Sequence, residues 1–155
     1  MSRAGKGRQA CVSWLPGQYG QIPYNAISAG DGVFIARAKT GSDVTPGMVR
    51  IGYNNAFFPF DGREEFITNY EVLCDTGLHV FGPEIVWKHM GGGCVPSGAI
   101  VGGNTSNGEP LYIARAHVNG ELCVGKVCQS HKCAYMPNQS KEHRIQNYEI
   151  LCFHE

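Results

Sequence analysis

The feature that most constrains the fold of this sequence is that much of it occurs twice. Residues 35–74 return without a gap as residues 113–152, because 113 minus 35 and 152 minus 74 both equal 78. Trp14 and Trp87 extend the match upstream at a slightly shorter offset, 87 minus 14 or 73. A tandem duplication predicts two similar modules that bury their apolar faces against each other, since a half-length unit would be only marginally stable alone. We divide the chain into a basic extension (1–13), a first repeat (14–82) and a second repeat (83–155).

The local sequence pattern predicts β-structure throughout. Glycine (21 residues) and proline (8 residues) separate short runs rich in β-branched and aromatic residues, at 33–38, 111–118 and 148–152. Turn pairs such as Asp61-Gly62 and Asn119-Gly120 fall where hairpins need them. The spacing of an amphipathic helix is not sustained in any window. We expect an all-β fold in one compact domain, with two small antiparallel sheets, one per repeat, related by a pseudo-twofold axis.

The charge composition limits the classes of partner. The 13 lysines and arginines equal the 13 aspartates and glutamates, so no broad positive field is available to attract nucleic acid, and we expect no nucleic-acid partner. The first residues are too polar for a secretory leader, and we expect no transmembrane segment because no stretch is apolar for long enough. These features predict a cytoplasmic protein, one associated with vesicles or one released by a non-classical route.

The seven cysteines form an odd set that favours thiols over a disulfide framework. Cys74 and Cys152 occupy equivalent repeat positions at the end of apolar runs, which predicts core packing. Cys123, Cys128 and Cys133 are five residues apart and lack the Cys-x2-Cys spacing of a zinc knuckle. We therefore expect no metal and no other cofactor.

Sequence motifs of catalysis are also missing. The chain contains no nucleophile elbow, phosphate-binding loop, zinc-protease helix or dinucleotide fingerprint. Thiols and histidines are numerous enough to be paired by chance, so their presence alone does not indicate catalysis. We expect that the protein is not an enzyme.

Polar groups suited to a hydroxylated ligand are better supplied. Lys126 lies in the apolar run Val-Gly-Lys-Val, and Lys141-Glu142-His143-Arg144 forms a dense cluster of donors and acceptors. An ammonium group offers three donors, and a carboxylate accepts two hydrogen bonds from adjacent hydroxyls, which is the chemistry that reads a sugar. The alternative for this cluster is a solvated surface of paired charges.

The order of motifs in the second repeat resembles a known family. The matching segments are Trp87, residues 95–103, residues 111–116, Gly125-Lys126-Val127, residues 130–135, residues 141–144 and residues 148–152. Together they closely resemble the DM-nine repeat of invertebrate lectin-like proteins and natterin-type toxins. The resemblance implies a tandem all-β unit, binding of mannose or mannose-containing glycans, a homodimer, and a role in an innate-immune or infection response.

The resemblance also implies particular ligand residues. Lectins of this family use the lysine of the Gly-Lys-Val segment, here Lys126, with an aspartate two positions after a Gly-Gly pair, here Thr105. We expect Asn104, Asn107 and Glu142 to contribute to the same carbohydrate site. In the first repeat the lysine position is Met48, and Asp31 is the acceptor retained by the shorter loop.

The difference between the repeats leaves a second function open. The alternative is an intracellular protein-interaction or vesicle-associated response factor of the same fold that has lost sugar binding. Its candidate contact residues are four aromatic side chains of the first repeat, Tyr53, Phe57, Phe58 and Phe60. The other interpretation of these side chains is that they pack in the core.

Overall fold

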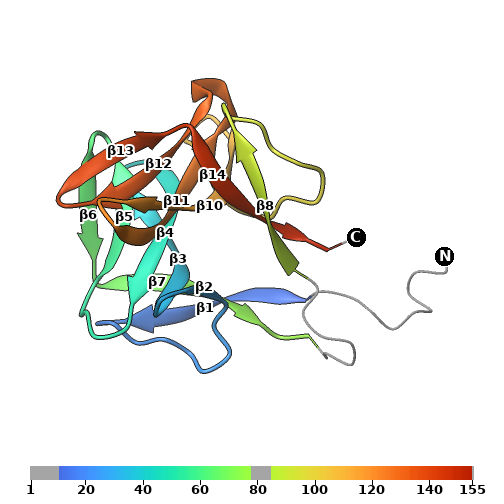
Figure 1. Ribbon diagram of the computed structural model, residues 1–155. Coiled ribbons are helices and arrows are strands. Elements are labelled where there is room, and N and C mark those ends of the chain that lie inside the picture. The colour runs from blue at the N-terminus through green and yellow to red at the C-terminus, as the bar shows by residue number, and fades with distance from the viewer. Residues whose placement is uncertain (1–10, 78–84, 155) are drawn as a thin grey trace, which may run out of the picture.

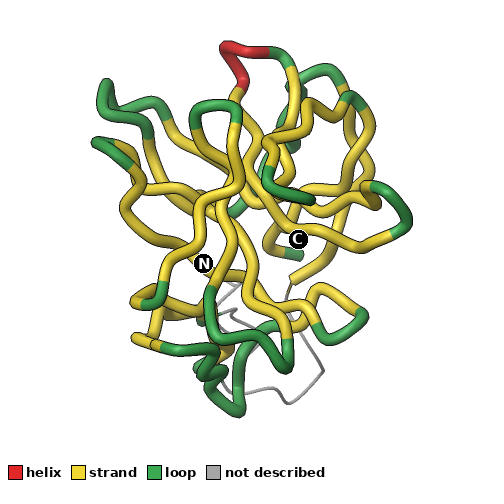
Figure 2. Tube along the Cα trace, turned by 90° about the vertical axis from the view of Figure 1, so that its left-hand side faces the viewer, coloured by secondary structure: helices red, strands yellow, loops and turns green. Residues whose placement is uncertain are grey.

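The computed structural model describes residues 11–77 and 85–154 as an all-β fold. The trace in Figure 2 is strand over most of its length, with a short helix at one edge. In the described part of the first repeat there are seven strands: β1 (Val12–Gln18), β2 (Ser28–Gly30), β3 (Val33–Thr40), β4 (Asp43–Arg50), β5 (Ala56–Phe60), β6 (Arg63–Ile67) and β7 (Asn69–Asp75).

Among the described residues, the second repeat holds an equivalent series of strands and a short helix. Its elements are β8 (Ile85–Gly91), β9 (Val101–Asn104), β10 (Pro110–Val118), β11 (Glu121–Cys128), the 3-10 helix η2 (Gln129–His131), β12 (Cys133–Asn138), β13 (Lys141–Ile145) and β14 (Asn147–Phe153). The strands predicted at 33–38, 111–118 and 148–152 are confirmed as parts of β3, β10 and β14. Most of the predicted basic extension, residues 1–10, lies outside the described residues.

The strands of the two repeats form one continuous antiparallel sheet, so the prediction of two separate sheets was wrong. The order is β1-β7-β3-β4-β5-β6-β13-β12-β11-β10-β14-β8, with β2 beside β3 and β9 between β10 and β4. The repeats join where Arg63 pairs with Lys141 and where Val44 pairs with Asn104. These pairings satisfy backbone groups that two separate sheets would have left exposed at their edges. Figure 1 shows β5, β6, β12 and β13 together at one end of the molecule.

Tight turns follow the predicted glycine pairs. Asn119 and Gly120 between β10 and β11 have φ values of 51° and 80°, and Asp61 and Gly62 between β5 and β6 have 53° and 79°. Two successive positive φ values define the hairpin turn whose twist matches that of the strands, and Asn-Gly and Asp-Gly are the pairs that adopt it at least cost. The turns therefore fix the register of both hairpins.

The core is built from equivalent residues of the two repeats. Ile35, Ile113, Cys74 and Cys152 all have 0% exposure. The thiols of Cys74 and Cys152 donate to the carbonyl oxygens of the residues two positions earlier, at 3.4 and 3.5 Å. Their predicted role in core packing is confirmed.

Each repeat also carries the same arginine clasp. In the first, the Arg37 guanidinium lies 4.5 Å from the centre of the Trp14 ring and its Nε donates to Glu71 at 2.7 Å. In the second, Arg115 lies 4.4 Å from Trp87 and donates to Glu149 at 2.8 Å. Stacking on an aromatic face combined with a charge-assisted hydrogen bond fixes the outer strand of each repeat against its neighbours.

Within residues 11–77 and 85–154, no helix has the length and apolar character needed to cross a bilayer.

Candidate functional site

The side chain of Lys126 lies in a largely enclosed site, on a strand that the preceding glycine allows to approach its neighbour closely. Gly125 and Lys126 lie on β11, and Lys126 pairs in register with Tyr135 of β12. A Cβ atom at Gly125 would overlap the Tyr135 carbonyl oxygen, so only glycine allows the two strands to approach this closely. Lys126 itself is buried, with 8% exposure.

Two predicted ligand residues, Lys126 and Glu142, meet in an ion pair. The Lys126 Nζ lies 3.2 Å from Glu142 Oε2, and the two side chains retain only 10% and 11% exposure. The other carboxylate oxygen of Glu142 accepts a hydrogen bond from the Gly62 backbone N–H at 2.9 Å. Because Gly62 belongs to the first repeat, this site is completed by the opposite module.

Aromatic rings enclose the ammonium group of Lys126. Its Nζ lies 5.4 Å from the centre of the Tyr135 ring and 5.6 Å from that of Phe60. Phe60 comes from the first repeat, and a cation over an aromatic face is stabilised by the negative charge density of the ring. We call these four residues, Lys126, Glu142, Tyr135 and Phe60, the Lys126 site.

The polar rim of the Lys126 site consists of Tyr135, His131 and Arg144. Burial, followed by the neighbouring Cys133, raises the pKa of Tyr135 to about 12, so its hydroxyl stays protonated at neutral pH. That hydroxyl is 2.9 Å from His131 Nδ1 and accepts from Arg144 Nη1 at 3.4 Å. The site thus combines donors, one carboxylate and two ring faces.

The predicted residues lie together where β9 ends: Asn104 is the last residue of β9, and Thr105 and Asn107 lie on the turn to β10. The Thr105 hydroxyl accepts from the Glu109 backbone N–H at 3.1 Å. The carboxylate of Glu109 accepts from the Ser130 N–H at 3.0 Å and from its hydroxyl at 2.8 Å, and these hydrogen bonds hold the pKa of Glu109 below its usual value. Through Ser130 the turn is tied to η2, directly after the strand that carries Lys126.

The remaining predicted residue, Asp31, is exposed on the turn between β2 and β3 of the first repeat and has a φ of 53°. Its location is a tight turn of the kind that aspartate tolerates well. The structure therefore brings Lys126 and Glu142 together, groups three other residues on one turn, and places Asp31 on a separate turn.

Phe60 is the member of the Lys126 site that sequence reasoning assigned elsewhere. It was a candidate for a partner surface, together with Tyr53, Phe57 and Phe58. Phe58 is fully buried at 0% exposure, which confirms core packing for that residue, whereas Tyr53 is 51% exposed. The contact between Phe60 and Lys126 crosses the repeats, so no local sequence signal indicated it.

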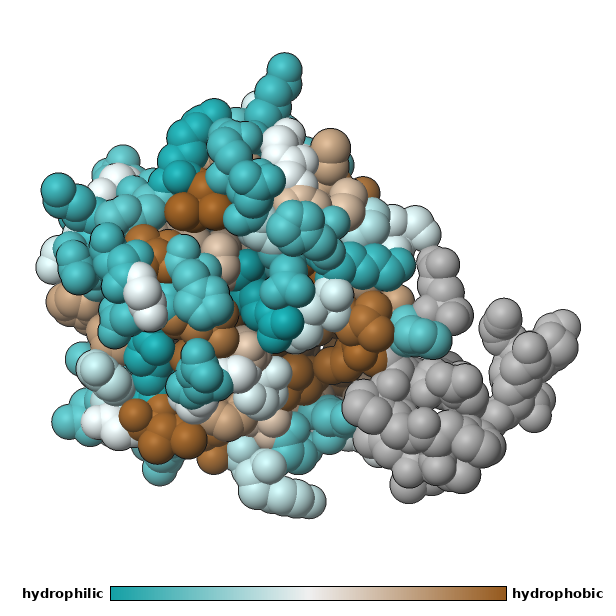
Figure 3. Space-filling view, in the orientation of Figure 1, coloured by the Kyte–Doolittle hydropathy of each residue, from teal (hydrophilic) through white to brown (hydrophobic). Residues whose placement is uncertain are grey.

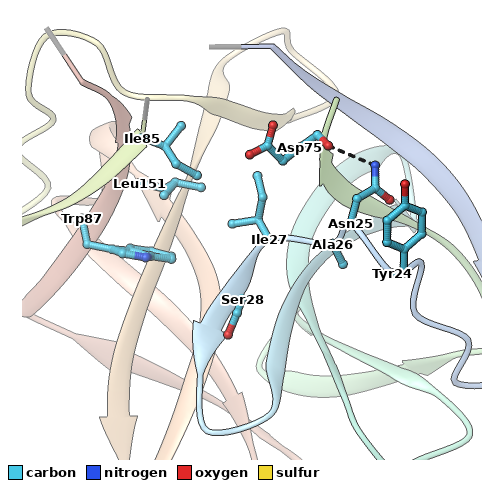
Figure 4. Close-up of a pocket in the computed structure, with 9 residues that line it drawn as sticks. All are labelled: Tyr24, Asn25, Ala26, Ile27, Ser28, Asp75, Ile85, Trp87 and Leu151. Atoms are coloured by element: carbon cyan, nitrogen blue, oxygen red, sulfur yellow. Dashed lines mark hydrogen bonds between the residues drawn. The ribbon is translucent and has the colours of Figure 1, made fainter. Parts of the chain in front are cut away.

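A cavity of about 600 Å³ lies elsewhere, between the repeats. Figure 4 shows its lining of apolar and polar side chains, with the Asn25 amide donating to the Asp75 carbonyl oxygen at 3.0 Å. The nine lining residues contain no predicted ligand residue: Tyr24, Asn25, Ala26, Ile27, Ser28, Asp75, Ile85, Trp87 and Leu151.

Comparison with known proteins gives a family match and similarity to solved structures. A model of the DM9 repeat matches residues 28–145. The fold is similar to that of the nematode sperm cell motility protein MFP2B, with a TM-score of 0.69 and 14% identity, over 94% of this chain and 45% of that one. At this identity the similarity shows the fold alone, and the chain spans less than half of that protein. No curated protein matches the sequence.

Proposed function

Because this chain belongs to the DM9 repeat family, whose model matches residues 28–145, we propose that it binds carbohydrate through its second repeat and recognises mannose or mannose-containing glycans. The observation that carries the proposal is the buried pair of Lys126 and Glu142 at 3.2 Å beside two aromatic rings. Sugar hydroxyls exchange hydrogen bonds with an ammonium and a carboxylate, and the apolar face of a sugar ring packs on aromatic carbon.

The chemistry proposed for each group follows from its charge. Lys126 donates to a sugar hydroxyl, and Glu142 accepts from an adjacent hydroxyl while it remains bonded to the Gly62 N–H. Arg144 and Tyr135 supply further hydrogen bonds at the rim. No bond of the sugar is broken in this proposal, which assigns the protein a binding role and no catalysis.

We propose further that the repeats are related by a pseudo-twofold axis and that the protein acts as a homodimer in an innate-immune or infection response. A homodimer would present two second-repeat sites. Two linked sites bind a branched glycan more tightly than one because the second contact is intramolecular.

The test is calorimetric titration in reducing buffer with mannose, a mannose-rich oligosaccharide and galactose as the control. Saturable binding of mannose near one site per chain, and its loss in the double variant Lys126→Met with Glu142→Gln, supports the proposal. The double variant removes the charges without leaving either of them unpaired. Equal binding of galactose, or binding that survives in the double variant, would refute it.

A second candidate function is supported by exposed aromatic residues. Tyr53 and Phe66 are 51% and 56% exposed and both contact Phe57 edge-on. In Figure 3 the visible face is mostly hydrophilic, with separate hydrophobic areas among the hydrophilic residues. Exposed aromatic side chains are typical of protein interfaces. No heat of binding at millimolar sugar would favour the intracellular interaction factor over the lectin.

A further inference from the structure

The first repeat contains a counterpart of the Lys126 site with a different chemistry. At the offset of 78, Met48, Phe57, Glu64 and Phe66 correspond to Lys126, Tyr135, Glu142 and Arg144. The acid is therefore retained, while the lysine and the arginine are replaced by a thioether and a ring. A cavity of about 180 Å³ is present here, lined by Met48, Arg50, Tyr53, Phe57, Glu64, Phe66, Glu121, Asn138 and Gln139.

Three aromatic rings form one wall of this cavity. The centres of Tyr53 and Phe57 are 5.6 Å apart with their planes at 84°, and those of Phe57 and Phe66 are 5.4 Å apart at 86°. Rings at right angles present faces in different directions, as in the aromatic cages that bind methylated ammonium groups. The exposure of Tyr53 and Phe66 leaves the wall accessible from solvent.

The charges around this cavity favour a cation. Its lining contains the carboxylates of Glu64 and Glu121 and one guanidinium, that of Arg50. The Arg50 Nη2 donates to the Leu122 carbonyl oxygen at 2.7 Å, which ties this cation to β11. Glu64 accepts from the Ser140 N–H at 2.9 Å, so its carboxylate is held in place. The three charged groups sum to an excess of one negative charge.

The second repeat shows how such a site is filled. There the protein's own ammonium group, on Lys126, lies beside the equivalent acid and the ring equivalent to Phe57. In the first repeat, Met48 leaves the corresponding position without a charge. The retained acid and ring are thus a cation-binding environment in which a methionine replaces the ammonium group, and the Arg50 guanidinium, which also lines the cavity, offsets one of its two carboxylates.

We propose that the first repeat binds a methylated ammonium group, with the aromatic wall on its methyl groups and Glu64 as its counter-charge. The cavity, at about 180 Å³, is smaller than the ~300–1,000 Å³ typical of sites for whole ligands. It therefore holds the ammonium group itself and leaves the rest of the ligand outside. The group can belong to a small choline-like molecule or to a trimethylated lysine side chain, which share this chemistry.

The experiment titrates the full chain, labelled with 15N, with choline, with a peptide containing trimethyl-lysine, and with 3,3-dimethyl-1-butanol. The last compound is the neutral counterpart of choline, with carbon in place of nitrogen. We expect the cations to shift the amide signals of the first repeat saturably and to bind at least about tenfold more tightly than the neutral compound, since the ring faces attract a desolvated cation and not a neutral group. Tighter binding of the peptide assigns the group to a modified protein, and tighter binding of choline assigns it to a small molecule.

Two variants make the proposal falsifiable. Met48→Lys supplies an internal ammonium group as in the second repeat and should abolish binding of both cations. Phe66→Leu removes an exposed ring with little effect on folding and should weaken binding about tenfold. Lys141→Met, at an exposed position on β13, is the matched control and should leave binding unchanged. Equal binding of the neutral compound, no binding of either cation, or undiminished binding in the folded Phe66→Leu variant would overturn the proposal.

Discussion

Removal of the Lys126 charge tests the buried ion pair directly. The variant Lys126→Met installs the residue found at the equivalent position of the first repeat. The Glu142 carboxylate then keeps its hydrogen bond from the Gly62 N–H, at 2.9 Å. It loses the ion pair with Lys126, which is its only ion pair among the described residues. Removing one partner of a buried pair typically costs about 3–5 kcal/mol. Because both side chains remain about one tenth exposed, we expect a loss of about 2–4 kcal/mol in the free energy of unfolding. For a chain of this length, this corresponds to a fall in Tm of roughly 5–15 °C.

The assay is a double-mutant cycle by urea denaturation. Lys126→Met and Glu142→Gln are measured singly and together, and the slope of the unfolding free energy against urea should not change. The double variant should recover most of the loss, because neither charge is then left unpaired, which gives a coupling energy of about 2 kcal/mol. Lys141→Met, which changes the exposed lysine next to Glu142 on β13, should cost less than about 0.5 kcal/mol. A coupling energy near zero, or a Lys126→Met variant as stable as the wild type, would refute the reasoning.

Three further predictions follow from single positions. Gly125→Ala should lower the free energy of unfolding by about 1–3 kcal/mol, measured by urea denaturation, because the added Cβ overlaps the Tyr135 carbonyl oxygen. Burial raises the pKa of Glu64 in the folded state, so the ionised form of Glu64 opposes folding. The variant Glu64→Gln should therefore be more stable than the wild type at pH 7, and this difference in the free energy of unfolding should vanish below about pH 4, where Glu64 is protonated in both states. A difference that stays constant between these pH values would contradict the prediction. Thr105→Asp should strengthen mannose binding by about 1–2 kcal/mol in calorimetry by supplying a charged acceptor, and unchanged affinity would remove this turn from the site.

Much of the fold could be predicted from local sequence. The turn pair Asn119-Gly120 and the apolar runs around Ile35 and Ile113 fix hairpins through interactions between near neighbours, and these were confirmed. The joining of the repeats into one sheet depends on pairings such as Arg63 with Lys141, which are 78 residues apart in sequence. Local sequence patterns contain no information about which distant strands pair, and the prediction of two separate sheets was therefore wrong.

The candidate site could be predicted only in part for the same reason. Lys126 and Glu142 belong to one repeat, and their residue types already indicated complementary chemistry. Phe60 reaches Lys126 from the other repeat, and the cavity beside Met48 includes Glu121 and Asn138 from the second repeat. Side chains that meet across the two repeats can be recognised only when the arrangement of the repeats is known.

The measurement that tests the central claim most directly is the 15N–1H spectrum of the full chain during titration with mannose, with galactose in a parallel sample. The account predicts that mannose shifts the signals of Lys126, Tyr135 and their neighbours in the second repeat, while the equivalent positions Met48 and Phe57 do not move and galactose has no effect. Shifts centred on the first repeat, equal shifts with galactose, or no shifts at millimolar mannose would contradict it.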